Sequence, residues 1–452
     1  MKKVLACTVF FLGAATFLSM GTANGAPSAA DTSTINIAYS SNVLGYYEPC
    51  GCLETGEQLG GIYKKAAYLD QYRKNHGDVL IVDSGDLLNE DLDLPEGVRD
   101  SAKLKADLIV RIYNTIGIDA VTPGELDLVL GVKTLKDLET KYKFPFIAAN
   151  LVDESGKTIF KPYIIKKVNG KTVGVFGIIG DTSEMAKQVN EVTDGAATVT
   201  DALKAAQAVA QELSGKVDYL VALTHEGTNR DWVIARRVKG VDLVVGGHDK
   251  QDTKDPNVAD KTLIVQAGEK CQHLGMMQIS TDGSKTATNT LVPFGDSMPA
   301  DPKIKAMISE YNDKVVDMYS DSKSKPAVGN APLRLAKCES CHADQVAKWK
   351  TTDHAKAYAT LVKKGKQFDP DCLACHTTRF EQPEGFSMKL QQPDLANIQC
   401  ETCHGYAKEH LSDMKPIPTP KPELALCLKC HTPYRAPDFQ KNAQMEMEKI
   451  KH

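Results

Sequence analysis

The chain has 452 residues, a length that predicts two or three domains. Apolar residues make up 42% and charged residues 25%, which is ordinary for a folded globular protein and excludes disordered, collagen-like and multi-span membrane classes. A net charge of −4 is too mild to indicate nucleic acid as a partner. The unusual counts are 12 cysteines and 11 histidines, and their placement carries most of the information.

The first 25 residues have the pattern of a secretory signal peptide. Lys2 and Lys3 precede an uncharged apolar run over 4–20, and Ala23-Asn24-Gly25 fits a cleavage site between small residues. A membrane anchor is the alternative, but this run is at the short end for spanning a bilayer. Because no comparable run follows, we expect a periplasmic or extracellular protein with no transmembrane segment after signal removal.

Residues 35–295 alternate between short apolar runs and amphipathic stretches, which is typical of an α/β fold. Helices are expected over 61–76, 99–116 and 200–213. Strands are expected over 35–39, 79–82, 146–149, 173–179, 220–223, 243–245 and 263–266.

Several stretches in this region resemble the calcineurin-like metallophosphoesterases, specifically the secreted 5′-nucleotidase branch. The matching stretches are 60–62, 82–88, 146–151, 173–179, 224–227 and 246–248. The resemblance implies an α/β four-layer sandwich that holds two metals at the ends of its strands. The second domain that such nucleotidases use to hold the base is absent.

When the family's metal-ligand positions are transferred to this sequence, the resemblance implies that only one of the two ligand sets is kept. Asp86, Glu125, His225 and His248 occupy the second set, with Glu125 in place of an Asn, and two carboxylates with two imidazoles suit Zn, Mn or Fe. The first set is lost, because its positions carry Asn42, Leu44 and Lys250, and Leu126 replaces the catalytic histidine. The alternative is a decayed site whose remaining residues are only packed or solvated.

Three cysteines are expected to border the same cleft, and they are a candidate redox or thiol site. Cys50 and Cys52 follow the lost first ligands, and Cys271 follows a turn that borders the cleft in the resembling family. They could form a soft metal site, or a redox disulfide with one free thiol. A structural Cys52–Cys271 bond with Cys50 free is the other interpretation, and His273 could join either site.

Asp301-Pro302 predicts the start of a helix with Pro in the first turn. Its apolar face is expected to pack on the α/β domain and consists of Ile304, Met307, Ile308, Tyr311, Val315 and Met318. The polar stretch over 320–332 is a linker. The predicted organisation is a signal peptide (1–25), an α/β domain (26–300), a helix and linker (301–335) and a C-terminal domain (336–452).

The C-terminal domain repeats one motif four times. The pattern is C-x-x-C-H, in which two thiols add to the haem vinyl groups and the histidine becomes the proximal iron ligand. Four covalently bound haem c groups are therefore predicted. The attachment residues are Cys338, Cys341 and His342; Cys372, Cys375 and His376; Cys400, Cys403 and His404; and Cys427, Cys430 and His431.

Because the C-terminal domain has only about 29 residues per haem, the porphyrins must supply much of its interior. The stretches 338–357, 372–378, 400–410 and 427–452 resemble the cytochrome c-554 family of tetrahaem cytochromes, with Gly405-Tyr406-Ala407 where the family usually has Gly-Pro-Gly. The resemblance implies a small, mainly α, haem-packed multihaem cytochrome c domain. Short helices are expected over 344–364, broken at 351–352, and over 440–451.

Distal haem ligands can be counted, because only three other histidines remain in this domain. They are His354, His410 and His452, and each matches a distal-ligand position in the resembling family. Seven histidines for eight axial positions predict three haems with two histidine ligands and one haem with an open, water or non-histidine position. Met388 and Met414 are the candidate substitutes.

Electron transfer is the favoured function, with redox proteins or other cytochromes as partners and no nucleic acid. In this interpretation the α/β domain is a metal, thiol or docking module. The alternative is a metal-dependent phosphoester hydrolase, similar to a 5′-nucleotidase, that carries an appended cytochrome domain. The loss of the first ligand set and Leu126 count against hydrolysis, since two-metal chemistry needs both ions.

Overall fold

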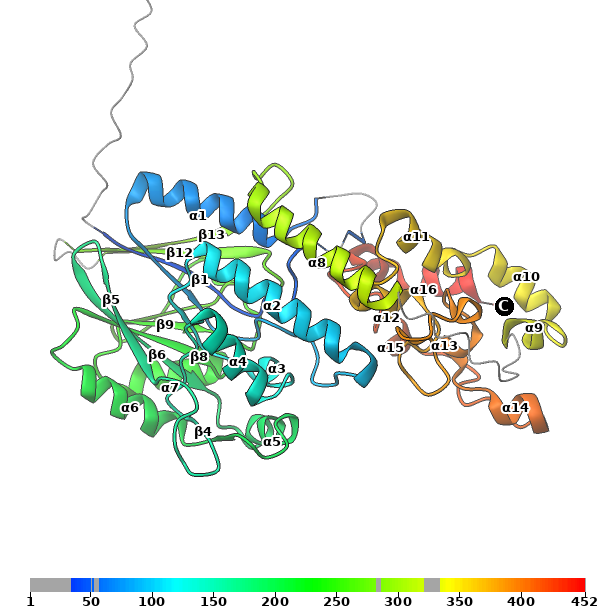
Figure 1. Cartoon of the computed structure of the whole chain (residues 1–452), viewed down its shortest axis with the longest axis horizontal. Coiled ribbons are helices and arrows are strands. Elements are labelled where there is room, and N and C mark those ends of the chain that lie inside the picture. Colours follow the sequence, from blue (N-terminus) through cyan, green and yellow to red (C-terminus); the bar gives the residue numbers. More distant parts are fainter. Residues whose placement is uncertain (1–33, 50, 53–56, 282–285, 321–333, 452) are drawn as a thin grey trace, which may run out of the picture.

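The computed structural model describes residues 34–49, 51–52, 57–281, 286–320 and 334–451. The predicted signal peptide, Cys50, most of the predicted linker and His452 lie outside these residues. Figure 1 shows an α/β part joined to a smaller helical part. Within the described residues, no helix is both long and apolar enough to cross a bilayer.

Two mixed β-sheets form the α/β part. The first has the strand order β13-β12-β1-β2-β3, and the second has the order β10-β11-β9-β8-β6-β5. The first comprises β1 (Thr34–Ser40), β2 (Val79–Asp83), β3 (Ala120–Val121), β12 (His273–Ser280) and β13 (Ala287–Pro293). The second comprises β5 (Tyr163–Val168), β6 (Lys171–Ile179), β8 (Tyr219–His225), β9 (Leu243–Gly246), β10 (Asn257–Ala259) and β11 (Thr262–Val265). A small separate pair joins β4 (Leu151–Val152) to β7 (Thr198–Val199).

The sheets pack face to face, and helices cover both outer faces, so the predicted four-layer sandwich is confirmed. Side chains such as Ile37, Val82 and Leu223 fill the layer between the sheets. The helices over the first sheet are α1 (Ile62–His76), α2 (Arg99–Ile116) and α4 (Val132–Tyr142), with the short η1 (Glu96–Val98) leading into α2. Those over the second are α6 (Ala202–Leu213) and α7 (Thr228–Arg237). The shorter α3 (Glu125–Leu128) and α5 (Ser183–Val192) complete this part.

The predicted strand over 146–149 is wrong. Phe146 and Ile147 form only isolated bridges, to Val121 and Lys161. The chain turns at Asn150, whose side chain accepts a hydrogen bond from the backbone N–H of Ile179 and donates one to its carbonyl. The N–H groups of the segment bond to three different neighbours, since Ile147, Ala148 and Ala149 donate to the carbonyls of Val121, Lys161 and Gly177, so no continuous strand pairing forms.

Helix α8 (Pro302–Ser320) lies beside α1 and α2, as its apolar face predicts. Ile304, Ile308, Tyr311 and Val315 are buried in the core. The expected Met318 is instead 39% exposed, and the helix buries Tyr319 at this turn.

A buried ionisable cluster ties α1 to the first sheet. Lys65 is fully buried and donates hydrogen bonds to Ser40 Oγ (2.7 Å) and Tyr113 Oη (3.0 Å). Both hydroxyls in turn donate to Asp83 Oδ2, at 2.5 and 3.1 Å. The ammonium therefore balances a buried carboxyl group through two bridging hydroxyls.

Replacing Lys65 with Met is expected to lower the free energy of unfolding by about 3–5 kcal/mol, because it leaves Asp83 buried without its cation. Denaturant unfolding followed by circular dichroism measures this change. Lys74→Met, on the exposed end of the same helix, is the matched control and should cost less than about 0.5 kcal/mol. Equal stability of the two variants would show that the buried Lys65 does not balance Asp83.

The C-terminal part contains short helices, as its sequence predicts. They are α9 (Arg334–Glu339), α10 (Ala343–Lys350), η2 (Asp353–Lys356), α11 (Ala357–Lys364), α12 (Pro370–His376), η3 (Pro393–Leu395), α13 (Cys400–His404), α14 (Lys408–Asp413), α15 (Leu424–Cys427) and α16 (Pro437–Ile450). The break in the first expected helix falls at Thr351 and Thr352, between α10 and η2.

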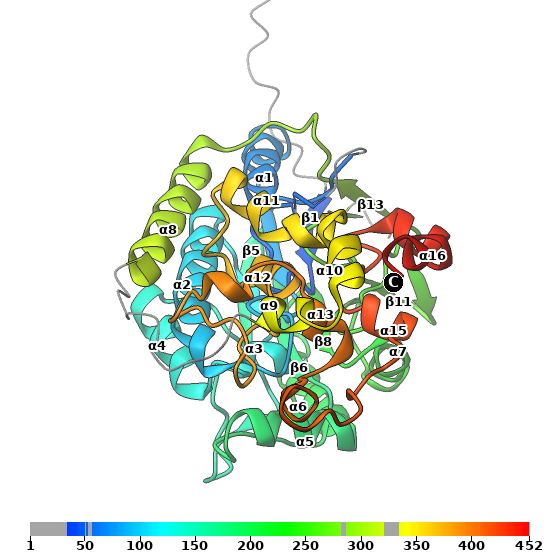
Figure 2. The ribbon, with the colours of Figure 1, turned by 90° about the vertical axis from the view of Figure 1, so that its right-hand side faces the viewer.

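The two parts share one apolar core, which continues from the α/β part to Leu361, Leu373 and Phe386. Figure 2 views the molecule from the side of the C-terminal part. Polar contacts frame the junction. Arg435 lies 3.0 Å from Glu90, Lys366 lies 3.1 Å from Glu48, and Lys105 lies 2.8 Å from Asp371. Tyr46 packs edge-on against Tyr434, with ring centroids 5.4 Å apart.

Candidate functional site

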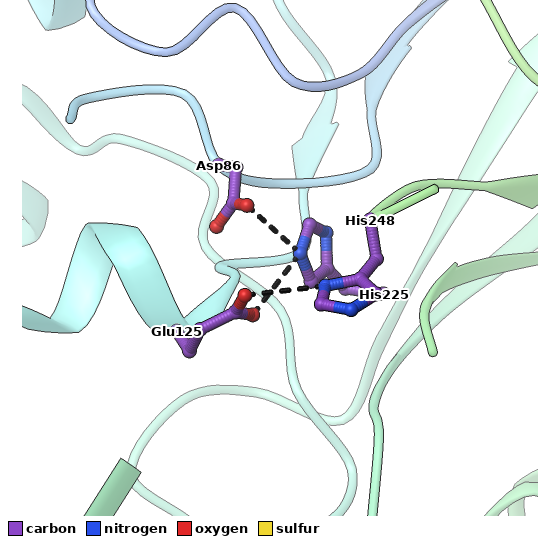
Figure 3. Close-up of side chains that lie close together, drawn as sticks. All are labelled: Asp86, Glu125, His225 and His248. Carbon is purple, nitrogen blue, oxygen red and sulfur yellow. Dashed lines mark ion pairs between the residues drawn. The ribbon is translucent and has the colours of Figure 1, made fainter. Parts of the chain in front are cut away.

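The loops that follow parallel strands bring four predicted metal ligands together (Figure 3). Asp86 follows β2, His225 ends β8, His248 follows β9, and Glu125 begins α3. One ligand atom from each of these side chains lies within 4.8 Å of every other. The first three are joined because β2, β8 and β9 present their carboxyl ends to the same edge of the sandwich.

His225 is fixed in an orientation that suits a metal ligand. Its Nδ1 lies 2.6 Å from the carbonyl oxygen of Ser84, which can only accept, so Nδ1 must carry the hydrogen. Nε2 then faces Asp86 Oδ2 and Glu125 Oε2, each 3.2 Å away. Nε2 and Glu125 Oε2 are buried and have no hydrogen-bond partner. Lone pairs that face one another at this distance repel, so a cation or a proton between them would stabilise the arrangement.

The electrostatics of this cluster also favour a cation. Burial alone would raise the pKa of Glu125, but the neighbouring His225 and His248 outweigh burial and hold that pKa below its usual value. Burial alone would lower the pKa of His225, but Asp86 and Glu125 outweigh it and raise that pKa well above its usual value. The two carboxylates therefore draw positive charge into the centre of the cluster.

Glycine backbones make room for the His225 ring. A Cβ on Gly124 would lie 2.2 Å from Asp86 Oδ1 and 2.7 Å from His225 Nε2. A Cβ on Gly85 would lie 2.9 Å from His225 Nδ1, and Gly85 also has a φ of +90°, a conformation that favours glycine.

Asp127 positions the cluster and was not identified from the sequence. Its carboxylate accepts hydrogen bonds from the backbone N–H groups of Leu87, Leu88 and Gly124, at 2.8–2.9 Å. It therefore joins the loop that carries Asp86 to the turn that carries Glu125. Its position two residues after Glu125 was the only hint in the sequence that Asp127 belongs to the site. Its hydrogen-bond partners could not be predicted, because tertiary contacts determine them.

The C-x-x-C-H motifs begin or lie within α9, α12, α13 and α15, and their cysteines meet in pairs. The side chain of Cys338 interacts with that of Cys400, and Cys375 with Cys430. The first motif thus neighbours the third, and the second neighbours the fourth.

Histidine rings from distant segments also pair. His342 and His410 have ring centroids 6.2 Å apart, and His354 and His431 have centroids 6.0 Å apart. His376, His404 and His410 place Nδ1 against the carbonyl oxygens of Ala357, Thr419 and Lys415, at 2.7–2.9 Å. Because a carbonyl only accepts, Nδ1 of each ring carries the hydrogen, and Nε2 is the nitrogen suited to ligate a metal.

Comparison with known proteins assigns both parts of the chain. Residues 50–252 match the family model for calcineurin-like phosphoesterases. Residues 337–405 match the model for cytochrome c554 and c-prime. The chain therefore combines a region similar to calcineurin-like phosphoesterases, named the phosphoesterase domain, with a region similar to cytochrome c554 and c-prime, named the cytochrome domain.

Individual relatives match the phosphoesterase domain. The chain is 27% identical over 297 residues to a 5′-nucleotidase of Bos taurus, which covers 60% of this chain and 50% of the relative. It is 25% identical over 319 residues to the trifunctional nucleotide phosphoesterase protein YfkN of Bacillus subtilis. That alignment covers 59% of this chain and 21% of the relative. The chain thus spans half or less of these relatives.

A solved structure shares the fold of the phosphoesterase domain. It is the 5′-nucleotidase precursor of Thermus thermophilus, with a TM-score of 0.54 at 21% identity, over 63% of this chain and 59% of that one. This likeness supports the four-layer architecture.

The residues at the positions that the resemblance assigns to the first metal set make other contacts. Asn42 is fully buried, donates a hydrogen bond to the carbonyl of Gly268 (3.0 Å) and accepts one from the N–H of His248 (2.9 Å). Leu44 is buried, whereas Lys250 is 42% exposed and lies 3.8 Å from Glu269. Asn42 is therefore a structural link that positions His248.

The expected Cys52–Cys271 disulfide is not formed in the phosphoesterase domain. Cys271 is a free, buried thiol, whereas Cys52 is disulfide-bonded, so a Cys52–Cys271 bond is wrong. Cys271 is 3% exposed inside the apolar core around α1. Cys50 lies outside the described residues. His273 places its Nδ1 3.0 Å from Asp252 Oδ1.

Proposed function

We propose that the protein is an exported electron-transfer protein whose cytochrome domain carries four covalently bound haem c groups. Its phosphoesterase domain binds one divalent metal ion and serves as a metal and thiol module. The paired histidine rings of the cytochrome domain are the observation that carries the electron-transfer part of this proposal.

The ring spacing would fit two imidazoles that hold one iron between them. Two trans imidazole nitrogens, each ~2.0–2.1 Å from a metal, place their ring centroids roughly 6 Å apart. The pairs His342–His410 and His354–His431 lie at 6.2 and 6.0 Å. We therefore assign His410 as the distal ligand of the first haem and His354 as that of the fourth.

The packing of the cytochrome domain also suits haem. Of the described residues after Glu401, no side chain whose exposure is given is fully buried. A polypeptide with so little buried apolar surface needs another source of interior. Porphyrins attached through the cysteine pairs would supply it and would lie close together, because the first motif meets the third and the second meets the fourth.

The proximal histidines His376 and His404 then share one remaining distal histidine, His452. One of these two haems is left without a histidine in its sixth position. Met388, which is fully buried in the core, and Met414, which is 72% exposed, stay the candidates for that position.

The phosphoesterase domain would hold its metal through Asp86, Glu125, His225 and His248. Two oxygens and two nitrogens are a donor set for Zn, Mn or Fe. Such an ion acts as a Lewis acid on an oxygen ligand. Two hydrogen bonds position the histidine ligands: His225 bonds to the Ser84 carbonyl, and the backbone N–H of His248 bonds to Asn42.

Phosphoester hydrolysis is the second candidate function, favoured by the retained cluster and by the named activity of the 5′-nucleotidase relatives. Against it, Asn42 and Leu44 occupy the first metal set, and Leu126 replaces the catalytic histidine. One metal does not hold both the attacking and the leaving oxygen. We therefore rank hydrolysis second.

Export follows from the signal pattern over 1–25 and from the attachment of c-type haem outside the cytoplasm. The proposed partners are redox proteins or other cytochromes. The proposed domain limits remain 26–300 and 336–452, joined by the helix and linker over 301–335.

Haem counting tests this proposal directly. The pyridine haemochrome assay and the mass of the intact purified chain should both give four haems per chain. A chain without covalently bound haem would refute the proposal.

A further inference from the structure

We propose that the phosphoesterase domain sets the reduction potential of the haems attached to the second and fourth motifs, through a cluster of charged and aromatic residues at the domain junction. This junction cluster consists of Tyr46, Glu90, Lys270, Tyr434 and Arg435. The inference rests on the proposed electron-transfer function. It gives the phosphoesterase domain a regulatory role that needs no hydrolysis.

An ion pair between the two domains forms the centre of the junction cluster. Arg435 of the cytochrome domain donates hydrogen bonds to Glu90 Oε2 (3.0 Å) and Tyr46 Oη (2.7 Å) of the phosphoesterase domain. The Tyr46 hydroxyl in turn donates to Glu90 Oε2 (2.8 Å). The side chain of Arg435 is only 17% exposed, and that of Glu90 is 29% exposed. Solvent and salt therefore screen these charges less than they would on an open surface.

A second cation, from the phosphoesterase domain, joins the junction cluster. Lys270 Nζ lies 3.1 Å from Glu90 Oε1 and 3.6 Å from Glu269. Its ammonium also sits 5.2 Å from the centre of the Tyr46 ring and 4.9 Å from that of the Tyr434 ring. The Lys270 side chain is buried. Glu90 thus balances a cation from each domain, so removing one of these charges leaves another uncompensated.

The guanidinium of Arg435 lies near the sulfurs to which two haems would be attached. Arg435 follows the proximal histidine His431 by four residues. Its charge acts on the side chains of Cys372, Cys375 and Cys430. The first two of these cysteines belong to the second motif, and Cys430 belongs to the fourth. One cation is therefore close to the attachment sites of both haems.

The charges of the junction cluster would act on these haems in opposite directions. A ferric haem that accepts one electron becomes ferrous and loses one unit of positive charge. A nearby cation therefore favours the ferrous form and raises the potential, whereas a nearby carboxylate lowers it. Arg435 and Lys270 would raise the potential, and Glu90 would offset them. Because Glu90 and Lys270 belong to the phosphoesterase domain, that domain sets the balance.

An ion pair that only holds the domains together is the alternative, and the sign of the potential shift separates the two. Arg435→Gln and Glu90→Gln break the same contact between the domains. Loss of packing at the junction would therefore change the potentials of both variants in the same direction. Loss of charge would lower the potential in Arg435→Gln and raise it in Glu90→Gln.

A redox titration of the full, haem-loaded chain, followed by its visible spectrum, measures this sign. In Arg435→Gln, reduction of at least one haem is expected to become about ten-fold less favourable, which lowers its potential by about 59 mV. Glu90→Gln should raise a potential by a similar amount. Arg435→Lys keeps the charge and should keep the wild-type potentials. Lys204→Gln is the matched control, because it breaks the exposed Lys204–Asp201 pair on α6, at the opposite end of the molecule (Figure 1).

Lys270→Gln is a second test, which leaves the Arg435–Glu90 contact in place and should also lower a potential. If Arg435→Gln does not fold, the opposite signs expected for Lys270→Gln and Glu90→Gln decide the question. The pyridine haemochrome assay should give four haems in each variant, so that a shift does not reflect lost haem. Shifts of the same sign in Arg435→Gln and Glu90→Gln would overturn the inference.

The inference and the proposed electron-transfer function fail in different ways. Haems that dithionite cannot reduce would refute electron transfer itself. Haems that are reduced at the wild-type potentials in every variant would refute only the role of the junction cluster.

Discussion

Replacing His225 and His248 together with Ala should abolish binding of the non-haem metal and leave the haem content unchanged. His225 is fully buried, and its Nε2 faces both carboxylates at 3.2 Å. His248 places Nδ1 3.2 Å from the other oxygen of Glu125. Removing both leaves only Asp86 and Glu125 in the cluster, and two carboxylates do not replace the lost imidazoles for Zn, Mn or Fe.

Elemental analysis of the purified protein, with iron corrected for haem, measures this loss. His273→Ala is the matched control, because His273 belongs to the same domain but pairs with Asp252 outside the cluster. It should keep the metal. The wild-type protein should also hydrolyse phosphate monoesters poorly. Two metal ions per chain together with fast hydrolysis would contradict this account and promote the hydrolase function.

The second large effect is expected in the electron paramagnetic resonance spectrum of the oxidised protein. Seven histidines for eight axial positions predict three low-spin haems and one high-spin ferric haem. His410→Ala should convert a further haem to high spin, because it removes the ring that lies 6.2 Å from His342. Glu409→Gln, an exposed neighbour on α14, is its control.

Four low-spin signals in the wild type would refute the ligand count. An unchanged spectrum in His410→Ala would refute the assignment of the first haem, since the iron would then take its sixth ligand from elsewhere. The same comparison applies to His354, whose ring pairs with that of His431.

Much of the architecture was predictable from local pattern. The strands β1, β2, β6, β8, β9 and β11 are recognisable as short apolar runs, because almost all of their residues are buried. The helices α2 and α6 are recognisable because each has one apolar face, which it buries against a sheet. The expected strand over 146–149 failed for a tertiary reason. Successive N–H groups of that segment bond to three different neighbours, at Val121, Lys161 and Gly177, and no spacing rule reveals those partners.

The candidate metal site was predictable as a set, because a family resemblance supplied the positions of Asp86, Glu125, His225 and His248. Its supports were not. Asp127 and the Ser84 carbonyl act through the folded loops, and the structural use of Asn42 appears only when its bonds to Gly268 and His248 are seen.

The pairing of haem-domain histidines was likewise beyond the sequence. His354 and His410 could be named as surplus histidines, but nothing in their spacing says which proximal ring each faces. The contact between the domains could not be predicted from the sequence. Glu90, Arg435 and Tyr434 are residue types common on protein surfaces, and only the folded structure brings them into contact.

A spectroelectrochemical titration of the full chain tests the central claim most directly. The visible spectrum is recorded against applied potential, and phosphate release from a monoester is assayed on the same sample. The account predicts reversible reduction of all four haems, one electron each, with negligible hydrolysis. Haems that cannot be cycled, accompanied by rapid phosphate release, would contradict it.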